Sequence, residues 1–506
     1  MKQSTEVITT DIVVIGSGPG GATLAYSLRD RGADVLLVEK GDFLPREPEN
    51  WSPHENYGLQ RYKADTTWID ASTGRGFRPN LYQYVGGCSK VWGTVLARLK
   101  EADFGEIRHE AGVSPRWPIT YRDLSPYYDE AERLYGAHGA VGKDPTAPVG
   151  QPAPPYAFVG HSPTVGTIVE RMTARGAHPY ELPVGIDYGA GGSCQLCATC
   201  DGFPCQVDAK NDAEMKAVRP AIKSPNVTLS VRTCIDRLST SDNGRRVIAA
   251  IGTRDGRPLE IRAQRFVVAA GAALSAALLL KSATAHHRSG LGNSSGLVGR
   301  HYMQHVFSAI LAIDPRHKTS TGFQKTAALN DFYLTSRYGY PLGNIQCLGK
   351  LHPEMLKASK PWVPLPLLRF MSKHGTDWWA TTEDIPDPDN RVTVSPNGQI
   401  VLAYRKNNLT AHRRLIKEAK RLLRQAGLPV VLASTLPITA TAAQCGTLRF
   451  GDDPTTSVLN RDCRLHDLEN VWVVDASFMP SSAAQNPGLT IAANALRVGA
   501  TGGIAD

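Results

Sequence analysis

Residues 11–40 read DIVVIGSGPGGATLAYSLRDRGADVLLVEK, and this stretch decides the fold of the N-terminal part of the chain. Residues 11–15 are a short apolar, β-branched run, which is typical of a buried parallel strand. Gly16, Gly18 and Gly21 follow in the spacing G-x-G-x-x-G. The first glycine permits a tight turn, the second lets backbone N–H groups approach a pyrophosphate, and the third lets the next helix pack closely on the strand.

The residues after the glycine triad complete the pattern of a nucleotide-binding unit. Residues 20–31 are expected to form a helix whose N-terminal N–H groups and dipole point at phosphates. Residues 35–38 predict a second strand that ends in Glu39, 18 residues after Gly21. An acid at that place suits a ribose 2′-OH and disfavours a 2′-phosphate. Glu39 and Lys40 are therefore candidate cofactor-binding residues, because a glycine-rich structural turn would explain neither the helix nor the acid.

Length and composition indicate a multidomain globular enzyme. At 506 residues the chain is long enough for two or three domains. Its hydrophobic content of 42% and charged content of 20% are ordinary for a soluble enzyme. The formal net charge of +9 is spread out, and the densest basic stretch, residues 413–424, alternates with Leu and Ile at helical spacing. That spacing favours a solvated helix face over a nucleic-acid site.

The sequence shows no targeting or membrane signal. No apolar run reaches the ~18–20 residues that a helix needs to span a bilayer. The first ten residues, MKQSTEVITT, lack the apolar core of a secretory signal. A cytoplasmic protein without a membrane span is the default expectation, with a signal already removed as the alternative.

The nine cysteines are unevenly distributed. Cys194, Cys197, Cys200 and Cys205 form a C-x2-C-x2-C-x4-C run, and the others are isolated: Cys88, Cys234, Cys347, Cys445 and Cys463. An odd count in a chain expected in the cytosol argues against a secreted disulfide framework. The run could hold Zn or an iron–sulfur centre, form local disulfides, or pack as a tight loop. Because no second metal-binding segment accompanies it, we expect a metal-free loop of thiols or disulfides that shapes the substrate domain.

The chain organisation is discontinuous. Strand patterns return over residues 226–271, broken by a turn at Asn243-Gly244, and a helix is expected over residues 275–282. Mixed strands and an amphipathic helix over residues 411–426 suggest a second domain. A final strand, loop and helix over residues 470–506 should return to the nucleotide-binding domain. We therefore predict an α/β (α+β) fold. Its nucleotide-binding domain comprises residues 1–45, 80–135, 206–304 and 440–506, and its mixed-sheet substrate domain and connecting loops comprise residues 46–79, 136–205 and 305–439.

Five motifs in this order resemble the glucose–methanol–choline (GMC) flavin oxidoreductases. They are the glycine triad, VGGCSKVWG near residue 90, VVAAGA near 270, VVDASFMP near 475 and NPGLTIAA near 490. Within that family the chain is similar to a bacterial branch related to pyranose 2-oxidase and glycoside 3-oxidases. The segments that carry this narrower similarity are CDGFPCQVDAKNDA, GNSSGLVGRHYMQH and GTLRFGDDPTTSVLNRDCRLHDLENVWVVDAS.

The resemblance implies FAD and oxidation of a secondary ring hydroxyl, at C3 or C2 of a pyranose or glycoside, to a ketone. Oxygen, a quinone or an artificial acceptor would take the electrons. Val91 stands where some pyranose oxidases carry a flavin-linking histidine, so we expect non-covalent FAD. The further residues implied to contact the flavin, the adenine or the ribityl and pyrophosphate part are Gly87, Ser89, Lys90, Trp92, Gly93, Thr233, Cys234, Ala270, Asp475, Ala476 and Thr490.

The resemblance also implies a catalytic pair in which one position is anomalous. Asn486 matches the residue that holds the substrate oxygen, whereas Ala443 stands where a histidine base is expected. Alanine accepts no proton, so three interpretations remain: an engineered inactive variant, a natural lineage with another base, or a non-catalytic relative. His305 and His466 are candidate replacement bases, although structural or surface roles explain both. A dehydrogenase with a quinone or cytochrome partner and a non-catalytic glycoside-binding flavoprotein are the alternative functions.

Overall fold

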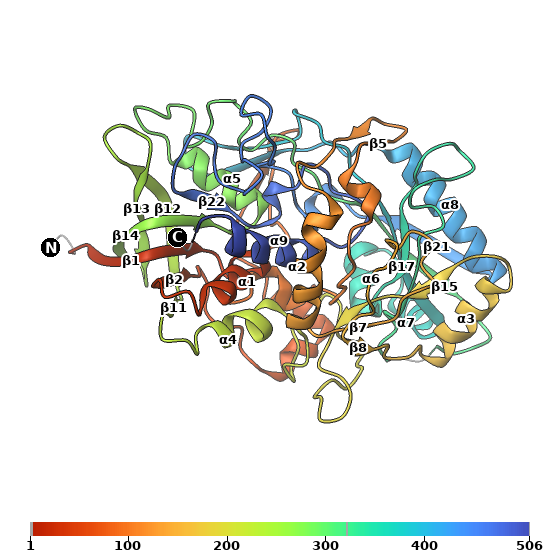
Figure 1. Ribbon diagram of the computed structural model, residues 1–506. Helices are drawn as coiled ribbons and strands as arrows, with labels where there is room; N and C mark the ends of the chain where they lie inside the picture. The colour runs from red at the N-terminus through yellow and green to blue at the C-terminus, as the bar shows by residue number, and fades with distance from the viewer. Residues whose placement is uncertain (1–3, 320–321, 505–506) are drawn as a thin grey trace.

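The computed structural model describes residues 4–319 and 322–504. Residues 1–3, 320–321 and 505–506, which belong to the predicted domain ranges, lie outside the described residues. Two sheets dominate the molecule (Figure 1): a largely parallel one at the end that carries both chain termini, and an antiparallel one at the other end. Among the described residues, no helix is long and apolar enough to cross a membrane.

The first sheet has seven strands and is built around the N-terminal strand. β1 pairs in parallel with β2 and β14, while β11 extends the sheet beyond β2 and β22 joins β14, both in parallel. β12, β13 and β14 form an antiparallel meander at the other edge. The strands are β1 (Glu6–Ile15), β2 (Val35–Val38), β11 (Val227–Ser230), β12 (Thr233–Thr240), β13 (Val247–Arg254), β14 (Arg257–Val268) and β22 (Val471–Val473).

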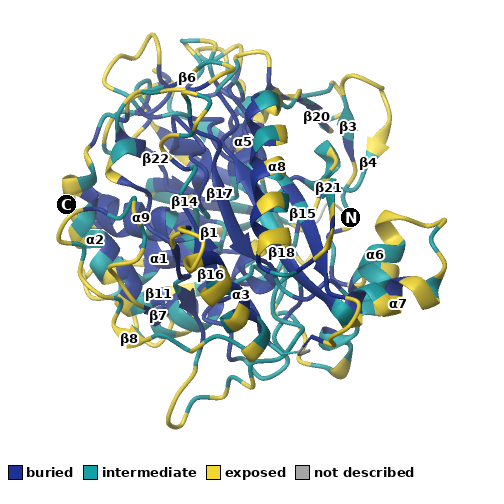
Figure 2. Cartoon of the chain, turned by 90° about the vertical axis from the view of Figure 1, so that its right-hand side faces the viewer, coloured by how far each residue is buried: buried dark blue, intermediate teal, exposed yellow. Residues whose placement is uncertain are grey.

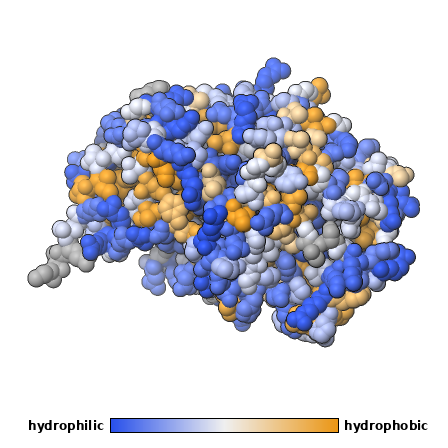
Figure 3. All heavy atoms as spheres, turned by 90° about the horizontal axis from the view of Figure 1, so that it is seen from below, coloured by the Kyte–Doolittle hydropathy of each residue, from blue (hydrophilic) through white to orange (hydrophobic). Residues whose placement is uncertain are grey.

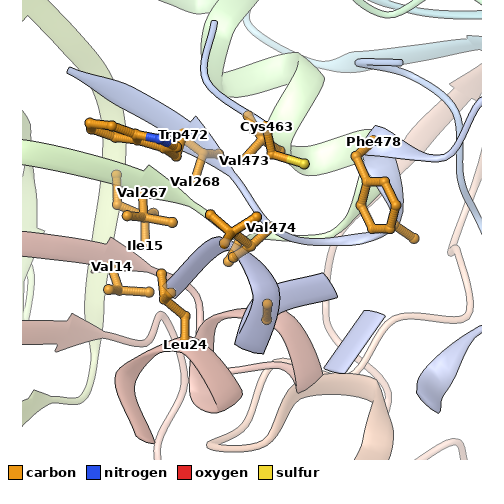
Figure 4. Packing of buried hydrophobic residues seen from close by; sticks show 14 of the residues in the cluster. Val14, Ile15, Leu24, Val267, Val268, Cys463, Trp472, Val473, Val474 and Phe478 are labelled. Carbon is orange, nitrogen blue, oxygen red and sulfur yellow. The ribbon is translucent and has the colours of Figure 1, made fainter. Parts of the chain in front are cut away.

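Close packing of helix α1 (Pro19–Leu28) on this sheet follows from the glycine triad. A Cβ on Gly21 would lie 2.0 Å from Gly16 O, and one on Gly20 would lie 2.2 Å from Val474 O. Only glycine lets the helix and the strand ends approach this closely. Figure 4 shows the apolar core that results, in which Val14, Val267 and Val473 from three parallel strands converge with Leu24 of α1.

The second sheet has six antiparallel strands in the order β21-β15-β18-β17-β16-β9. They are β9 (Pro179–Glu181), β15 (Val306–Ile313), β16 (Ala327–Leu329), β17 (Asn344–Cys347), β18 (Gly375–Thr382) and β21 (Val430–Thr435). Helix α8 (Leu409–Gln425) covers one face, and its buried residues recur at helical spacing while its outer face is exposed (Figure 2). The basic stretch 413–424 lies on this helix, as expected, and hydrophilic and hydrophobic side chains are interspersed over the face seen in Figure 3.

The remaining elements connect and cover the two sheets. The helices are α2 (Tyr121–Leu134), α3 (Pro163–Thr173), α4 (Arg219–Ala221), α5 (Ala272–Lys281), α6 (Pro353–Ser359), α7 (Leu365–His374) and α9 (Gly488–Thr501). A four-stranded sheet contains β3 (Trp68–Asp70), β4 (Gly76–Phe77), β19 (Arg391–Val394) and β20 (Ile400–Ala403). The short strands are β5 (Ile107–Arg108), β6 (Val113–Ser114), β7 (Ala137–Gly139), β8 (Tyr156–Ala157) and β10 (Val184–Gly185). Single turns of helix are η1 (Pro48–Trp51), η2 (His54–Gly58), η3 (Gly87–Val91), η4 (Glu101–Phe104), η5 (Glu214–Val218), η6 (Ile438–Ala440) and η7 (Ala476–Phe478).

The predicted α/β (α+β) fold with a Rossmann-like unit is confirmed, and the boundaries differ at the ends of elements. The predicted strand 35–38 matches β2, but the strand predicted over residues 11–15 begins five residues earlier, because β14 pairs with residues 6–10 as well. The helix predicted over 20–31 ends at Leu28. The C-terminal segment returns to the first sheet as β22 and α9, as the sequence predicts.

Candidate functional site: a dinucleotide cradle beside a catalytic loop

The carboxyl end of β1 opens onto a space beside Gly18 and Gly271. Among the described residues, no atom outside the adjacent residues lies within 4 Å of where a Cβ on Gly18 or on Gly271 would be, whereas the other two glycines of the triad are crowded by backbone. A Cβ on Gly87 would lie 3.1 Å from Gly18 Cα, so the turn η3 lies against the triad. The N-terminus of α1 points at this space, where its N–H groups would hold a pyrophosphate.

Glu39 lies at the end of β2 on the rim of the same space. Its Oε2 accepts hydrogen bonds from Ser17 N at 3.1 Å and Ser17 Oγ at 2.7 Å, and its Oε1 accepts one from Gly41 N at 3.0 Å. Burial raises the pKa of this carboxyl, and the Ser17 hydroxyl partly offsets that effect. The carboxylate is thus held where a ribose hydroxyl would donate to it.

Ser17 is a site residue that the sequence analysis missed. Besides binding Glu39, its Oγ accepts a hydrogen bond from Gly86 N at 3.1 Å and so ties the triad to the start of η3. A hydroxyl residue between the first two glycines was the available signal, but its two partners are 22 and 69 residues away.

The segment predicted to pass beside the flavin is held by buried polar contacts. Gly86 has a φ of +93°, which glycine adopts without strain. Ser89 Oγ donates to Gly86 O at 2.6 Å and accepts from Ala213 N at 3.0 Å. The ammonium of Lys90 pairs with Asp212 at 2.9 Å and Glu214 at 2.7 Å. Lys90 therefore anchors the segment from behind instead of pointing its charge into the cradle.

The end of this segment is closely covered. The ring of Trp92 lies against Gly488 at the start of α9, where a Cβ would come within 2.6 Å of the indole. Lys210 Nζ donates to Trp92 O at 2.9 Å, and Lys325 Nζ fills the place of a side chain at Gly93. Val91 is buried and offers no nucleophile to a flavin.

The other predicted cofactor residues divide into two groups. Thr233 and Asp475 lie at the rim of the cradle. The N–H of Thr233 donates to Glu39 O at 2.9 Å, and the carboxylate of Asp475 accepts from Gly271 N at 2.9 Å. Burial raises the pKa of the Asp475 carboxyl, which also caps η7. By contrast, Thr490 Oγ1 bonds Tyr128 OH at 2.8 Å, and the remaining predicted residues, Lys40, Cys234, Ala270 and Ala476, show no side-chain contact that assigns them a cofactor group.

The two segments predicted to be catalytic both contact residues 303–305. Cys445, two residues after Ala443, exchanges backbone hydrogen bonds of 3.0 Å with Met303. His305 Nε2 bonds Ser482 O at 3.0 Å, which fixes the loop that leads to Asn486. Both segments, whose predicted site residues are 43 positions apart in the sequence, therefore contact the same short stretch of chain.

Ala443 has a left-handed backbone conformation, with φ +53°. Histidine is among the residues enriched in that region, whereas alanine is not. The backbone at position 443 is therefore compatible with a histidine.

Neither candidate replacement base faces the site as a free imidazole. His305 is buried, and burial lowers its pKa, while its Nε2 is committed to Ser482 O. His466 Nε2 bonds Ser457 Oγ at 2.9 Å, next to the bridge between Leu459 and Leu465. Both histidines have structural partners.

A buried acidic cluster lies behind the Asn486 loop. Tyr333 OH donates to Asp103 Oδ2 at 2.8 Å and is approached by Ala484 N at 3.4 Å. Burial, followed by the charge of Glu383, raises the pKa of Asp103 to about 7. Burial likewise raises the pKa of Asp384, whose N–H bonds Ser482 Oγ, to about 7.

The cysteine run lines a small cavity of its own. Cys194, Cys197, Cys200 and Cys205 surround it with Lys210 and Phe323, and none is in a disulfide. Burial raises the pKa of Cys194 to about 11 and that of Cys200 to about 12, so these two thiols are protonated at neutral pH. Within residues 4–319 and 322–504, no three His, Cys, Asp or Glu side chains are arranged to hold a metal ion.

Comparison with known proteins places these features in one family. Family profiles described as GMC oxidoreductase match residues 80–307 and 386–495, and one described as an NAD(P)-binding Rossmann-like domain matches residues 14–63. The 6'''-hydroxyparomomycin C oxidase of Streptomyces lividus is 31% identical over 96% of this chain and 90% of its own length. Paromamine 6'-oxidase of Streptomyces fradiae is 30% identical with the same coverage. The solved structure of pyridoxine 4-oxidase from Mesorbium loti shares the fold, with a TM-score of 0.66 and 20% identity over 97% of this chain and 98% of that one.

Proposed function

The chain belongs to the GMC oxidoreductase family, and we propose that it is an FAD-dependent oxidoreductase that acts on a CH–OH group of a sugar or aminosugar. The observation that carries this proposal is the open cradle between Gly18, Gly271 and Glu39, with the Asn486 loop beside it. The named substrates of the two Streptomyces relatives support the substrate class.

The residues of the cradle fit FAD. The α1 N-terminus would hold the pyrophosphate, Glu39 a ribose hydroxyl, and η3 with Trp92 would lie along the isoalloxazine. When bound, FAD supplies an acceptor for hydride at its N5 atom. Because Val91 offers no side-chain nucleophile, we propose that the cofactor is not covalently linked. Acid precipitation should then release free FAD, and flavin left on the denatured polypeptide would refute this point.

Asn486 and position 443 would share the work on the substrate oxygen. The amide of Asn486 orients that oxygen by hydrogen bonding, and a base at position 443 would take the hydroxyl proton. Ala443 cannot do so, and His305 and His466 are committed elsewhere. We therefore propose that the chain binds FAD and sugar but reduces its flavin very slowly until a histidine is restored.

The regiochemistry is the finer part of the proposal. We propose a secondary ring hydroxyl, at C3 or C2, whereas the names of the two relatives include a 6' position. A substrate panel must therefore contain simple glycosides together with paromamine, and product analysis must distinguish a ketone from an aldehyde.

The test is to assay the FAD-loaded chain and its Ala443→His variant on this panel, with peroxide production followed in air and dye reduction followed with an artificial acceptor. Peroxide from the variant supports an oxidase, and dye reduction without peroxide supports the dehydrogenase alternative. If the variant binds FAD and sugar but turns over nothing in the panel, the chain is a glycoside-binding flavoprotein and the proposed activity is wrong.

A further inference from the structure

The side chain of Asn486 is held by a residue 140 positions away in the sequence. Gln346, on β17, donates a hydrogen bond from Nε2 to Asn486 Oδ1 at 3.1 Å. Gln346 is 1% exposed, whereas Asn486 is half-buried, so the bond joins a buried donor to an amide at the edge of the interior. Since Oδ1 is turned toward Gln346, the Nδ2 amino group is the end of the Asn486 amide that can donate to a substrate oxygen.

The sheet register shows which way Gln346 faces. It pairs with Ala328 on β16 and with Trp379 on β18, and directly paired residues share a face of a sheet. Ala328 packs on Val95 and Ala97, which follow the flavin segment. The neighbouring residues on the other face of the sheet pack beneath α8. Gln346 and Trp379 therefore face the cofactor half of the molecule.

Trp379 lies on this face next to a second aromatic ring. Its centroid is 5.4 Å from that of Phe307, with an interplanar angle of 48°. Both side chains are only half-buried, whereas the neighbouring Trp378, on the opposite face, is fully buried. Half-buried aromatic rings beside a fixed amide are suited to cover the C–H face of a sugar ring while its hydroxyls are hydrogen-bonded.

The energetics of Gln346 also indicate a role other than stability. Within the described part of the chain its Oε1 is buried and has no hydrogen-bond partner. A buried acceptor of this kind costs about 1–3 kcal/mol, and an apolar side chain at this strand position would avoid that cost. Keeping an amide there is explained if its other end, Nε2, orients Asn486.

We propose that Gln346 is a positioning residue for Asn486 and that Trp379 is a substrate-binding residue for the sugar ring, with Phe307 supporting it. We call these three residues, which lie on β17, β18 and β15, the sheet wall. The proposal rests on the proposed function, and it adds which part of the second sheet recognises the substrate and which residue orients the catalytic amide.

The binding part is tested on the FAD-loaded chain as it stands, because Ala443 leaves sugar binding measurable without turnover. Isothermal titration with paromamine and with methyl glucoside should show that Trp379→Leu weakens binding of the better ligand by about tenfold. Trp362→Leu is the matched control, since Trp362 is 74% exposed and its removal should change nothing. If the Trp379→Leu variant binds the sugar as tightly as the parent chain does, the assignment of Trp379 is wrong.

The positioning part is tested in the Ala443→His background. Gln346→Met keeps the length of the side chain but removes the donor. Gln346→Glu keeps the shape of the side chain but replaces the Nε2 donor with an oxygen acceptor. The Asn486 amide should then turn so that its Nδ2 group, and no longer its Oδ1, faces position 346. Both should lower the limiting rate of anaerobic flavin reduction by about 10–100-fold. Gln346→Met should leave the sugar dissociation constant and the melting temperature little changed, whereas Gln346→Glu, which buries a carboxyl group, should also lower the melting temperature.

Gln399→Met, at an exposed position, controls for the substitution itself. If Gln346→Met reduces its flavin at the parental rate, the positioning role is wrong. If the rate of flavin reduction in Gln346→Met falls only in proportion to a fall in the melting temperature, Gln346 has a structural role alone and the proposal also fails. A parental Ala443→His protein that never reduces its flavin would instead contradict the proposed function, while the titration with Trp379→Leu would still test the sheet wall.

Discussion

The dinucleotide cradle and the catalytic loop are built in opposite ways. The cradle comes from one continuous stretch, in which strand, glycine triad, helix and Glu39 follow within residues 11–40. The catalytic side is assembled from β17, the 303–305 segment, Ala443 and the loop before α9. A locally built site tolerates no change in its glycines, whereas a site built from distant segments depends on single side-chain contacts.

The largest effect is expected from a matched pair of glycine variants. In Gly21→Ala the new Cβ would meet Gly16 O at 2.0 Å, so α1 must leave the sheet, and we expect destabilisation of about 3 kcal/mol or more with loss of FAD. In Gly18→Ala the new Cβ would meet no described atom within 4 Å outside the adjacent residues, and φ is an ordinary −65°, so the apoprotein should melt normally but bind FAD at least about tenfold more weakly. Calorimetry and FAD titration measure both. Equal melting of the two apoproteins would contradict this account of the triad.

A smaller effect is expected at the rim of the cradle. Glu39→Ala removes a carboxyl acceptor for a ribose hydroxyl, so FAD affinity should fall by roughly 10–100-fold, the equivalent of about 1.5–3 kcal/mol. Glu39→Gln keeps an acceptor and should lose less. Fluorescence titration of apoprotein with FAD gives the dissociation constants, and an unchanged value for Glu39→Ala would remove Glu39 from the cofactor site.

These cradle residues show what the sequence was able to predict. Gly16, Gly18, Gly21 and Glu39 act through backbone geometry set within one βαβ unit, so their spacing alone predicts their places. The bonds from Ser17 to Gly86 and from Gln346 to Asn486 span 69 and 140 residues, and no local pattern encodes such a pairing. Lys90 was assigned to the cofactor by resemblance, although its charge is neutralised by Asp212 and Glu214 behind the segment.

The free energy of unfolding should depend on pH through two buried acids near the Asn486 loop. Asp103 and Asp384 have pKa values raised to about 7, so between about pH 4 and pH 7 the folded chain binds more protons than the unfolded chain. Stability from these groups is therefore lost as pH rises through that window, by up to about 1.4 kcal/mol per pH unit for each carboxyl. Asp103→Asn should flatten the dependence of unfolding free energy on pH. A variant with the parental slope would show that Asp103 is ionised in the folded state.

The smallest effect is expected at the cysteine run. We predict no stoichiometric iron or zinc in the purified protein, measured by elemental analysis, because the Cys194 and Cys200 thiols are protonated and no metal-binding arrangement occurs among the described residues. Cys197→Ser should then leave the flavin spectrum unchanged. Stoichiometric metal, or absorbance beyond the flavin bands that disappears in the variant, would contradict a metal-free loop and favour the dehydrogenase.

The central claim is that this chain is a sugar-oxidising flavoprotein that lacks only its base. Stopped-flow measurement of anaerobic flavin reduction in Ala443→His tests it most directly, with Ala443→Asn as the control, because asparagine suits the same left-handed backbone but removes no proton. The account predicts a rise of at least about two orders of magnitude for histidine, with a limb near neutral pH from the imidazole, and no comparable rise for asparagine. Equal rates in Ala443→His, Ala443→Asn and the parent chain across the glycoside panel would contradict it.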